Sequence, residues 1–182
     1  MKPSLRGHFL LASNSLMDPN FSRSVVLLVK HDEDGALGLI INRPLPVTVA
    51  EALGDALESV GELQRPLYKG GPCTGPLMAL SGMAVDKSEE VIMGVHFCVH
   101  QEALEKLIER DALPSRYVLG YAGWGSEQLE QELAEGAWMV APATPQDVFT
   151  EPTDELWARL MSRANLMKFI SPDFIPDDPS SN

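Results

Sequence analysis

The chain has 182 residues, of which 45% are apolar and 22% are charged, a composition typical of one compact domain and not of a disordered segment. Its 14 basic and 26 acidic residues give a net charge of −12, which argues against nucleic acid and anionic membranes as partners because both attract Lys and Arg. No segment approaches the roughly 18 to 20 apolar residues of a membrane span, and no secretory signal opens the chain, so we expect a cytoplasmic protein.

The first half of the chain alternates apolar runs with loops rich in proline, glycine and aspartate. In chain order it predicts a strand at 6–12, a polar loop at 13–22, strands at 24–30 and 37–42, a helix at 48–60 and a glycine-rich loop at 70–73. The short polar segment Asp32–Gly35 separates two apolar runs, which is typical of a β-hairpin. Thr48 and Glu51 have the spacing of a capping box, in which each side chain satisfies a backbone N–H of the other residue at a helix start.

The second half of the chain adds four predicted strands and three predicted helices. In chain order it predicts strands at 77–82 and 91–99, a helix at 101–111, a strand at 116–121, a turn at 120–125, a helix at 126–135, a strand at 138–141, a helical turn opened by Thr144-Pro145 and a helix from Thr153 to about Asn165. Leu104, Leu107 and Ile108 share one face of the first of these helices. Three glycines predict the tight turn, and Ser126 is the predicted N-cap of the helix that follows.

The mixture of elements predicts an α+β fold with a largely antiparallel sheet. A doubly wound parallel sheet would need a crossover between successive strands, whereas a tight hairpin joins the early strands here. Residues 1–170 are predicted to form a single domain. The last segment, 171–182, contains three prolines and three aspartates, so we predict a flexible acidic tail.

Four sequence blocks, taken together, resemble the bacterial YqgE/AlgH family. They are Leu16–Val26, Gly35–Pro44, Tyr68–Pro72 and Gly120–Glu132, and Trp138 follows the last block. The resemblance covers the chain from about residue 5 to 142. It implies an α+β fold with a partly closed, barrel-like sheet flanked by helices, a cytoplasmic bacterial protein, and the label of a transcriptional regulator. The family has no established reaction, so the resemblance implies no catalytic residues, and Cys73 departs from its more common apolar residue.

Four polar residues near the predicted hairpin are candidate ligand-binding residues: Asp18, Arg23, Asn42 and Arg43. An arginine can bind a carboxylate through two parallel hydrogen bonds, so these residues could bind a ligand. The same residues could instead form an internal network that ties the hairpin to the preceding loop. The sequence leaves both interpretations open.

The glycine-rich segments supply the remaining candidates. Gly70 and Gly71 could form a nest of backbone N–H groups that binds an anion, or a tight turn where two strands pack. Gly123, Trp124 and Gln128 lie at the predicted start of a helix, where free N–H groups and the helix dipole favour anions. Glu127 and Glu130 in the first turn would compete with an anion, so the segment could instead have a structural use. Because flanking glycines give the Trp124 indole little local cover, we predict that it lies at the rim of a cleft facing the Asp18–Arg23 loop.

These observations favour a binding or regulatory module that acts on gene expression indirectly, through a protein partner or a small ligand. The alternative is an enzyme of unknown reaction that uses the glycine-rich loops as a substrate cradle. Direct DNA binding is disfavoured by the negative charge. The two cysteines and four histidines do not have metal-ligand spacing, so we expect neither a metal nor a cofactor.

Overall fold

The structure, a computed structural model, describes residues 3–53 and 63–170, which form ten strands and five helices. The strands are β1 (His8–Ala12), β2 (Val25–Asp32), β3 (Gly35–Ile40), β4 (Pro44–Thr48), β5 (Pro66–Lys69), β6 (Cys73–Ser81), β7 (Glu89–Ile92), β8 (Val95–Cys98), β9 (Ser115–Gly125) and β10 (Trp138–Pro142). The helices are α1 (Val49–Leu53), α2 (Gln101–Glu109), α3 (Gln128–Ala134), α4 (Pro145–Val148) and α5 (Leu156–Ile170). The predicted tail, 171–182, lies outside the described residues.

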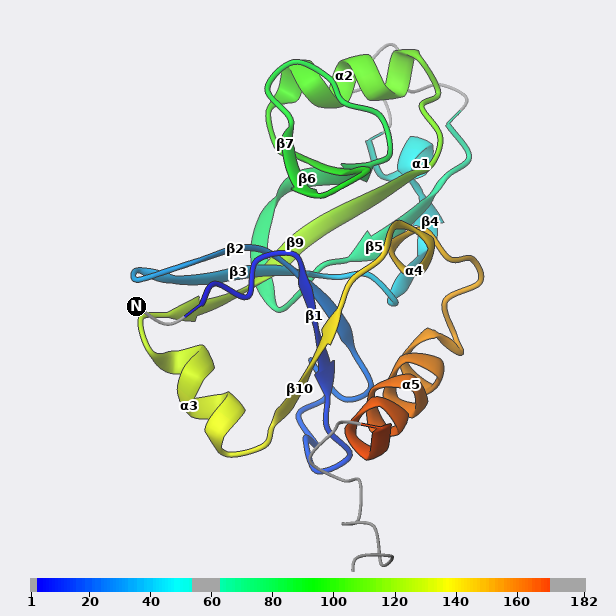
Figure 1. Ribbon diagram of the computed structural model, residues 1–182. Coiled ribbons are helices and arrows are strands. Elements are labelled where there is room, and N and C mark those ends of the chain that lie inside the picture. The colour runs from blue at the N-terminus through cyan, green and yellow to red at the C-terminus, as the bar shows by residue number, and fades with distance from the viewer. Residues whose placement is uncertain (1–2, 54–62, 171–182) are drawn as a thin grey trace, which may run out of the picture.

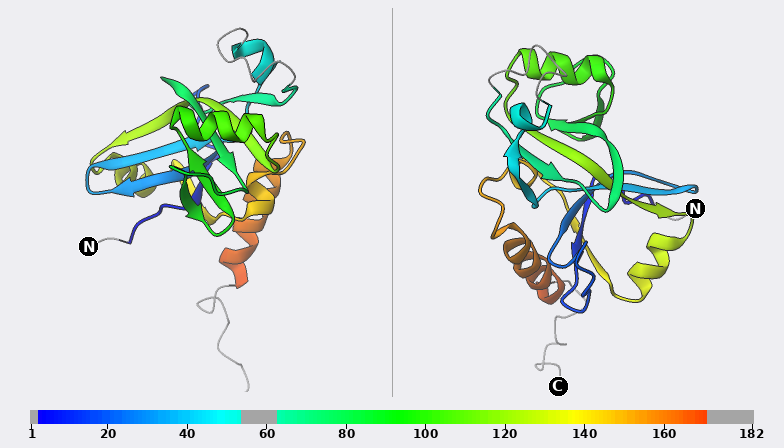
Figure 2. Two further views of the ribbon diagram at one scale, coloured as in Figure 1. Left: turned by 90° about the horizontal axis from the view of Figure 1, so that it is seen from above. Right: turned by 180° about the vertical axis from the view of Figure 1, so that it is seen from behind.

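One curled sheet organises the fold, and Figures 1 and 2 show that α3 and α5 flank β1 and β10 while α2 lies at the opposite end. The strand order is β10-β1-β2-β3-β9-β6-β8-β7, with β5 also pairing with β9 and β4 pairing with β5. Among the described strands, only the β5–β9 pair is parallel. The predicted α+β class with a largely antiparallel sheet is therefore confirmed.

The sheet curls until its β7 edge approaches the start of β1, which gives the partly closed, barrel-like form that the resemblance implied. Arg6, just before β1, bridges β2 and β7, because its Nε donates to Val29 O at 2.9 Å and its Nη2 donates to Glu90 O at 2.8 Å. Gly7 has a φ of +79°, and a Cβ there would lie 3.0 Å from Val91 O. Side-chain and glycine contacts thus close this side of the sheet in place of a strand pair.

The hairpin of β2 and β3 confirms the prediction for the first half of the chain. The two strands pair from Val26 with Ile40 to Asp32 with Gly35, and the register shifts between Leu28 and Lys30. The capping box is also confirmed, since Thr48 N donates to a Glu51 carboxylate oxygen and Glu51 N donates to Thr48 Oγ1. The predicted end of that helix near residue 60 lies outside the described residues.

The glycine-rich loop at 70–73 proves to be a crossing of the chain over strand β9. Lys69 at the end of β5 pairs with Leu119 of β9, whereas Cys73 at the start of β6 pairs with Tyr121 of β9. Since Tyr117 pairs with both β5 and β6, these strands lie on opposite edges of β9. Three residues must therefore carry the chain across β9, which requires a very close approach of two backbones.

Glycine is required on both sides of this crossing. A Cβ on Gly70 would lie 2.1 Å from Gly120 O, and a Cβ on Gly71 would lie 2.2 Å from the carbonyl carbon of Tyr121. Gly120 itself has a φ of +76°, and a Cβ there would lie 2.7 Å from Cys73 O. No side chain fits at these distances, so the glycines allow the backbones to pass each other.

The predicted turn at 120–125 is wrong, because this segment is the last part of β9. Pairing with β3, in which Gly123 lies opposite Leu37, keeps the chain extended to Gly125. The predicted N-cap is also wrong. Helix α3 starts after Glu127, which has a φ of 63°, while Ser126 Oγ donates to Glu33 O at the tip of the β2–β3 hairpin.

One further strand prediction needs correction. The segment predicted as one strand at 91–99 is a second hairpin, in which Ile92 of β7 pairs with Val95 of β8. Gly94 has a φ of +81°, a conformation that permits the tight reversal. The residues directly before the glycine-rich loop, Pro66–Lys69, form β5, which pairs with β9.

Three apolar clusters fill the space between the sheet and its helices. Helix α5 covers the cluster that contains Phe9, Leu27 and Leu39. The apolar face of α2 that the sequence predicted, Leu104, Leu107 and Ile108, packs in the second cluster. Leu129 of α3 packs with both Trp124 and Trp138 in the third. None of the described helices is both long and apolar enough to span a membrane.

Candidate functional site

The candidate site is built around the loop between β1 and β2, which two residues after β3 hold in place. Asn42 Oδ1 accepts a hydrogen bond from Val25 N at 2.8 Å, and its Nδ2 donates to Arg23 O at 2.9 Å. Arg43 donates from Nη1 to Pro19 O and from Nη2 to Ser22 O, both at 2.9 Å. These four bonds all reach backbone atoms, so the two side chains fix the loop's conformation.

Asp18 and Arg23 also have structural contacts in this loop. An Asp18 carboxylate oxygen accepts from Asn20 N at 2.8 Å. Arg23 adopts a φ of 56°, and its guanidinium carbon lies 5.7 Å from the centre of the Trp157 ring on α5. Burial lowers the pKa of Arg43, while the charge of Asp18 acts in the opposite direction. The structure therefore brings Asp18, Arg23, Asn42 and Arg43 together as an internal network.

Although its backbone is fixed, the tip of this loop faces solvent. Met17 is 79% exposed, and Asp18, Pro19 and Asn20 are exposed as well. We call residues 16–23 the display loop. A loop with a fixed backbone and exposed side chains is suited to recognition, because little conformational entropy is lost when a partner binds.

We expect Asn42→Ala to lower the free energy of unfolding by about 1–3 kcal/mol, since the Val25 N–H, in a buried strand, would lose its acceptor. Urea denaturation measures this loss. Asn20→Ala is the matched control, because Asn20 is an exposed amide in the same loop and should change stability by less than about 0.5 kcal/mol. Equal effects of the two substitutions would contradict the role assigned to Asn42.

Gly70 and Gly71 do not form a vacant anion nest at this position. Gly70 N donates to Leu119 O at 2.9 Å, and Gly70 O accepts from Ile40 N at 2.8 Å. Atoms of Tyr121 and Ala122 lie within 2.4 Å of the position that a Cβ on Gly71 would take. The structure thus uses both glycines for the crossing described above.

Trp124 is enclosed and does not lie at the rim of a cleft, which corrects its predicted placement. Only 6% of the residue is exposed, and its ring packs 6.3 Å from Phe21 and 5.9 Å from Trp138, measured between centroids. The indole does lie against the loop before β2, because Phe21 belongs to that loop. Gly123 is exposed and has no positive φ.

Glu132, which is not among the predicted ligand-binding residues, organises this aromatic cluster. Its Oε2 accepts hydrogen bonds from the indole nitrogens of Trp124 at 2.8 Å and Trp138 at 2.7 Å. Its Oε1 accepts from Gln128 Nε2 at 3.0 Å, and Gln128 Oε1 accepts from Gly125 N at 3.1 Å. Gln128 therefore positions Glu132 on α3. The spacing of four residues between them was the available signal.

A hollow of about 860 Å³ lies beside the tip of the β2–β3 hairpin. It is lined by Ser4, His31, Asp32, Glu33, Asp34, Ser126, Glu127 and Glu130. His31 Nε2 lies 2.9 Å from Glu130 Oε1, and His31 Nδ1 accepts from Leu5 N at 2.8 Å. These partners assign the neutral tautomer with hydrogen on Nε2. The hollow contains none of the candidate residues that the sequence predicted.

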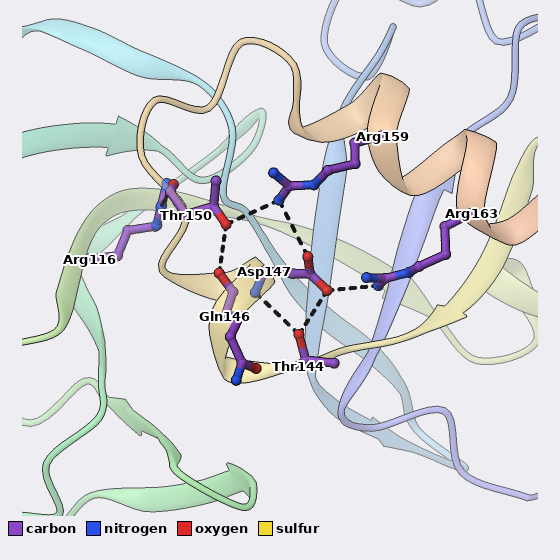
Figure 3. Close-up of polar contacts among 7 residues, drawn as sticks. All are labelled: Arg116, Thr144, Gln146, Asp147, Thr150, Arg159 and Arg163. Atoms are coloured by element: carbon purple, nitrogen blue, oxygen red, sulfur yellow. Dashed lines mark hydrogen bonds and ion pairs between the residues drawn. The ribbon is translucent and has the colours of Figure 1, made fainter.

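A second charged cluster joins α4 to α5 (Figure 3). The Asp147 carboxylate, which is buried, accepts from Arg163 at 2.7 Å, from Thr144 Oγ1 at 2.8 Å and from Arg159 at 3.4 Å. Burial alone would raise the pKa of Asp147, but the hydrogen bonds from Arg163 and Thr144 outweigh it, and the pKa lies below its ordinary value of 3.8. Both arginines are thus engaged in the structure.

Asp147→Asn should destabilise the chain at neutral pH by about 1–3 kcal/mol. A carboxyl group whose pKa falls on folding stabilises the folded state above its unfolded pKa, and this stabilisation is lost as the pH falls through the lower folded pKa. The difference in stability between wild type and Asp147→Asn should therefore shrink below about pH 4. Urea denaturation at pH 7 and pH 3 measures it, with exposed Asp154→Asn as control. A difference that is independent of pH would contradict the argument.

Across residues 3–53 and 63–170, no group of three His, Cys, Asp or Glu side chains is arranged to hold a metal ion. Cys98 is buried, and burial raises the pKa of its thiol to about 11, so it stays protonated at neutral pH. The predicted ligand-binding residues fall into three separate groups: the display-loop network, the crossing glycines, and the Trp124–Gln128 cluster. The last of these contacts the display loop through Phe21.

Comparisons with a family model, with individual proteins and with solved structures all identify the same family. The AlgH-like family model matches residues 9–167. A UPF0301 protein of Streptomyces avermitilis is 39% identical over 188 residues, covering 98% of this chain and 96% of the relative. A UPF0301 protein of Chlorobaculum tepidum is 38% identical over 159 residues, covering 84% of this chain and 83% of the relative.

Solved structures share the fold as well. The solution structure of the AlgH protein from Pseudomonas aeruginosa is 35% identical, with a TM-score of 0.72, and the match covers 92% of this chain and 93% of that one. The crystal structure of a protein from Corynebacterium diphtheriae is 27% identical, with a TM-score of 0.74 and coverage of 90% and 88%. From its sequence and its fold, the chain belongs to the AlgH-like family.

Proposed function

We propose that this chain is a cytoplasmic binding module that acts on gene expression indirectly, through a protein partner, and that the display loop is the surface that contacts this partner. The observation that carries the proposal is the combination of a backbone held by Asn42 and Arg43 with an exposed tip at Met17. A small ligand is the other binding partner consistent with a module of this kind.

The contacts that the candidate polar groups make within the protein support a binding function over a catalytic one. Asn42 and Arg43 bond to backbone, Gln128 and Glu132 hold two indoles, and the glycines accommodate neighbouring backbone. Side chains committed in this way are not available as nucleophile or base. The net charge of −12 supports a partner other than DNA.

The test is quantitative capture of binding proteins from a bacterial lysate with three tagged forms of the chain. Met17→Ser removes the exposed apolar side chain of the display loop. Met93→Ser is the matched control, because Met93 is 87% exposed but lies at the β7–β8 turn. Both variants should keep the wild-type free energy of unfolding to within about 0.5 kcal/mol. We expect specific partners to be lost with Met17→Ser and retained with Met93→Ser.

Two outcomes would overturn the proposal. One is a set of captured proteins that Met17→Ser does not change. The other is a mobility shift of duplex DNA with a steep dependence on salt, since phosphate contacts release counterions. The alternative, an enzyme with a glycine-rich substrate cradle, has less support because backbone atoms of β9 fill the space beside Gly70 and Gly71. Turnover that disappears in His31→Gln, beside the hollow, would favour an enzyme.

A further inference from the structure

Arg116 on β9 is a buried charge, with 2% of the residue exposed. Its Nη1 donates to Ile41 O, and its Nη2 donates to Thr150 O at 2.8 Å. Figure 3 shows its guanidinium reaching the loop between α4 and α5 that carries Thr150. Its Nε has no hydrogen-bond partner among the described residues. A buried cation of this kind is costly unless an anion compensates it.

The compensating anion is supplied from the surface by Glu151. Arg116 Nη2 lies 3.0 Å from Glu151 Oε1, although the Glu151 side chain is 51% exposed. The buried hydroxyl of Tyr68 donates to the same carboxylate oxygen, and the Tyr68 ring lies 4.3 Å from the guanidinium carbon of Arg116. Glu151 thus reaches inward from a loop to a position formed by two buried donors.

These contacts have the chemistry of a carboxylate-binding site. The guanidinium forms an ion pair with one carboxylate oxygen, and the phenol hydroxyl donates a charge-assisted hydrogen bond to the same oxygen. Burial raises the pKa of Tyr68, so its hydroxyl remains a donor at neutral pH. Both donors come from strands of the sheet, β5 and β9, whereas Glu151 comes from a connecting loop. The donors are therefore the rigid part of the arrangement, and the carboxylate is the part that can leave.

We propose that Arg116 and Tyr68 form a binding site for one carboxylate group of a small organic acid, and that the Glu151 side chain occupies this site as an internal ligand. An external carboxylate that displaces Glu151 would remove one of the two contacts between Arg116 and the α4–α5 loop, and the bond to Thr150 O would remain. Thr150, next to Glu151, also accepts a hydrogen bond at its Oγ1 from Arg159 of α5 at 3.1 Å, so a shift of the loop would be transmitted to α5. This site is separate from the display loop, and its test does not depend on the function proposed above.

Propionate is the natural probe, because it reproduces the side chain of Glu151 beyond its Cα. In the wild-type chain the tethered carboxylate competes with it at high effective concentration. In Glu151→Ala the site is vacated, and the buried charge of Arg116 is left without its anion. We expect propionate to bind Glu151→Ala at least about tenfold more tightly than the wild type, and to raise the melting temperature of this variant more than sodium chloride of equal ionic strength does.

Two controls make the measurement specific. Glu155→Ala removes an exposed carboxylate from the same loop and should respond to propionate as the wild type does. Tyr68→Phe combined with Glu151→Ala removes one donor and should weaken propionate binding about fivefold. The Nε–Hε resonance of Arg116, followed by NMR during the titration, reports binding at the site itself.

The proposal fails if propionate and chloride have equal effects on Glu151→Ala and the Arg116 resonance does not move. It also fails if Glu155→Ala gains the same response as Glu151→Ala, because the effect would then be a general reduction of negative charge.

Discussion

Gly71→Ala is expected to prevent stable folding, with a loss of more than about 4 kcal/mol. The added Cβ would lie 2.2 Å from the carbonyl carbon and oxygen of Tyr121 and 2.4 Å from Ala122 N. These are backbone atoms of a strand that is paired on both edges near the crossing, so they are unable to move aside as a flexible side chain would. The soluble yield and the urea midpoint of the variant measure the effect.

Gly123→Ala is the matched control for this substitution, because Gly123 lies in β9 two residues beyond Tyr121 but has different surroundings. A Cβ on Gly123 would lie 3.2 Å from the ring edge of Tyr121, and a side chain can adjust to that distance. We expect Gly123→Ala to change stability by less than about 1 kcal/mol. A Gly71→Ala chain that unfolds at the wild-type midpoint would show that β5 and β6 do not pass β9 in this way.

Trp124→Ala is expected to cost about 3–5 kcal/mol, the range for truncating an enclosed aromatic residue. The loss combines the packing of the indole against Phe21 and Trp138 with its hydrogen bond to Glu132. Trp124→Phe keeps an aromatic ring and removes the N–H, so it should cost about 1–2 kcal/mol. Urea denaturation followed by circular dichroism measures both variants without relying on tryptophan fluorescence.

The measured stability of Trp124→Ala also distinguishes a structural role of Trp124 from the ligand-binding role predicted from the sequence. If Trp124→Ala kept nearly full stability but lost a binding partner, the indole would act in recognition despite its burial. If it loses stability in the expected range, Trp124 acts on the display loop indirectly, since Phe21 of that loop packs against the indole. In that case the loop should become more mobile, with faster amide hydrogen exchange at residues 16–23.

Local signals in the sequence were sufficient to predict the structure where the interacting residues lie close together along the chain. The β2–β3 hairpin, the Thr48–Glu51 capping box and the apolar face of α2 each depend on residues a few positions apart. Their periodicity and turn chemistry specify the same local conformation in any compact fold. The Thr144 N-cap of α4 follows the same rule, because its side chain bonds to Asp147 N three residues later.

The tertiary structure decided the meaning of the glycine-rich segments. The sequence predicted a turn at 120–125, because glycines favour turns when considered alone. Pairing with β3 keeps that segment extended, and the approach of the segment after β5 explains why Gly70, Gly71 and Gly120 carry no side chain. A glycine that allows a turn and one that allows two backbones to pass have the same local sequence signal.

The same limit applies to the polar residues. The sequence predicted that Asn42 and Arg43 lie near the loop, but it did not predict their hydrogen bonds to the loop backbone. No local pattern indicated that Glu151 contacts Arg116 on a distant strand. Composition and spacing determine which residues are able to pair, and they determined here the class of fold and the hairpin. The choice among possible partners is made by long-range strand pairing, because the sheet sets which side chains come within hydrogen-bond distance.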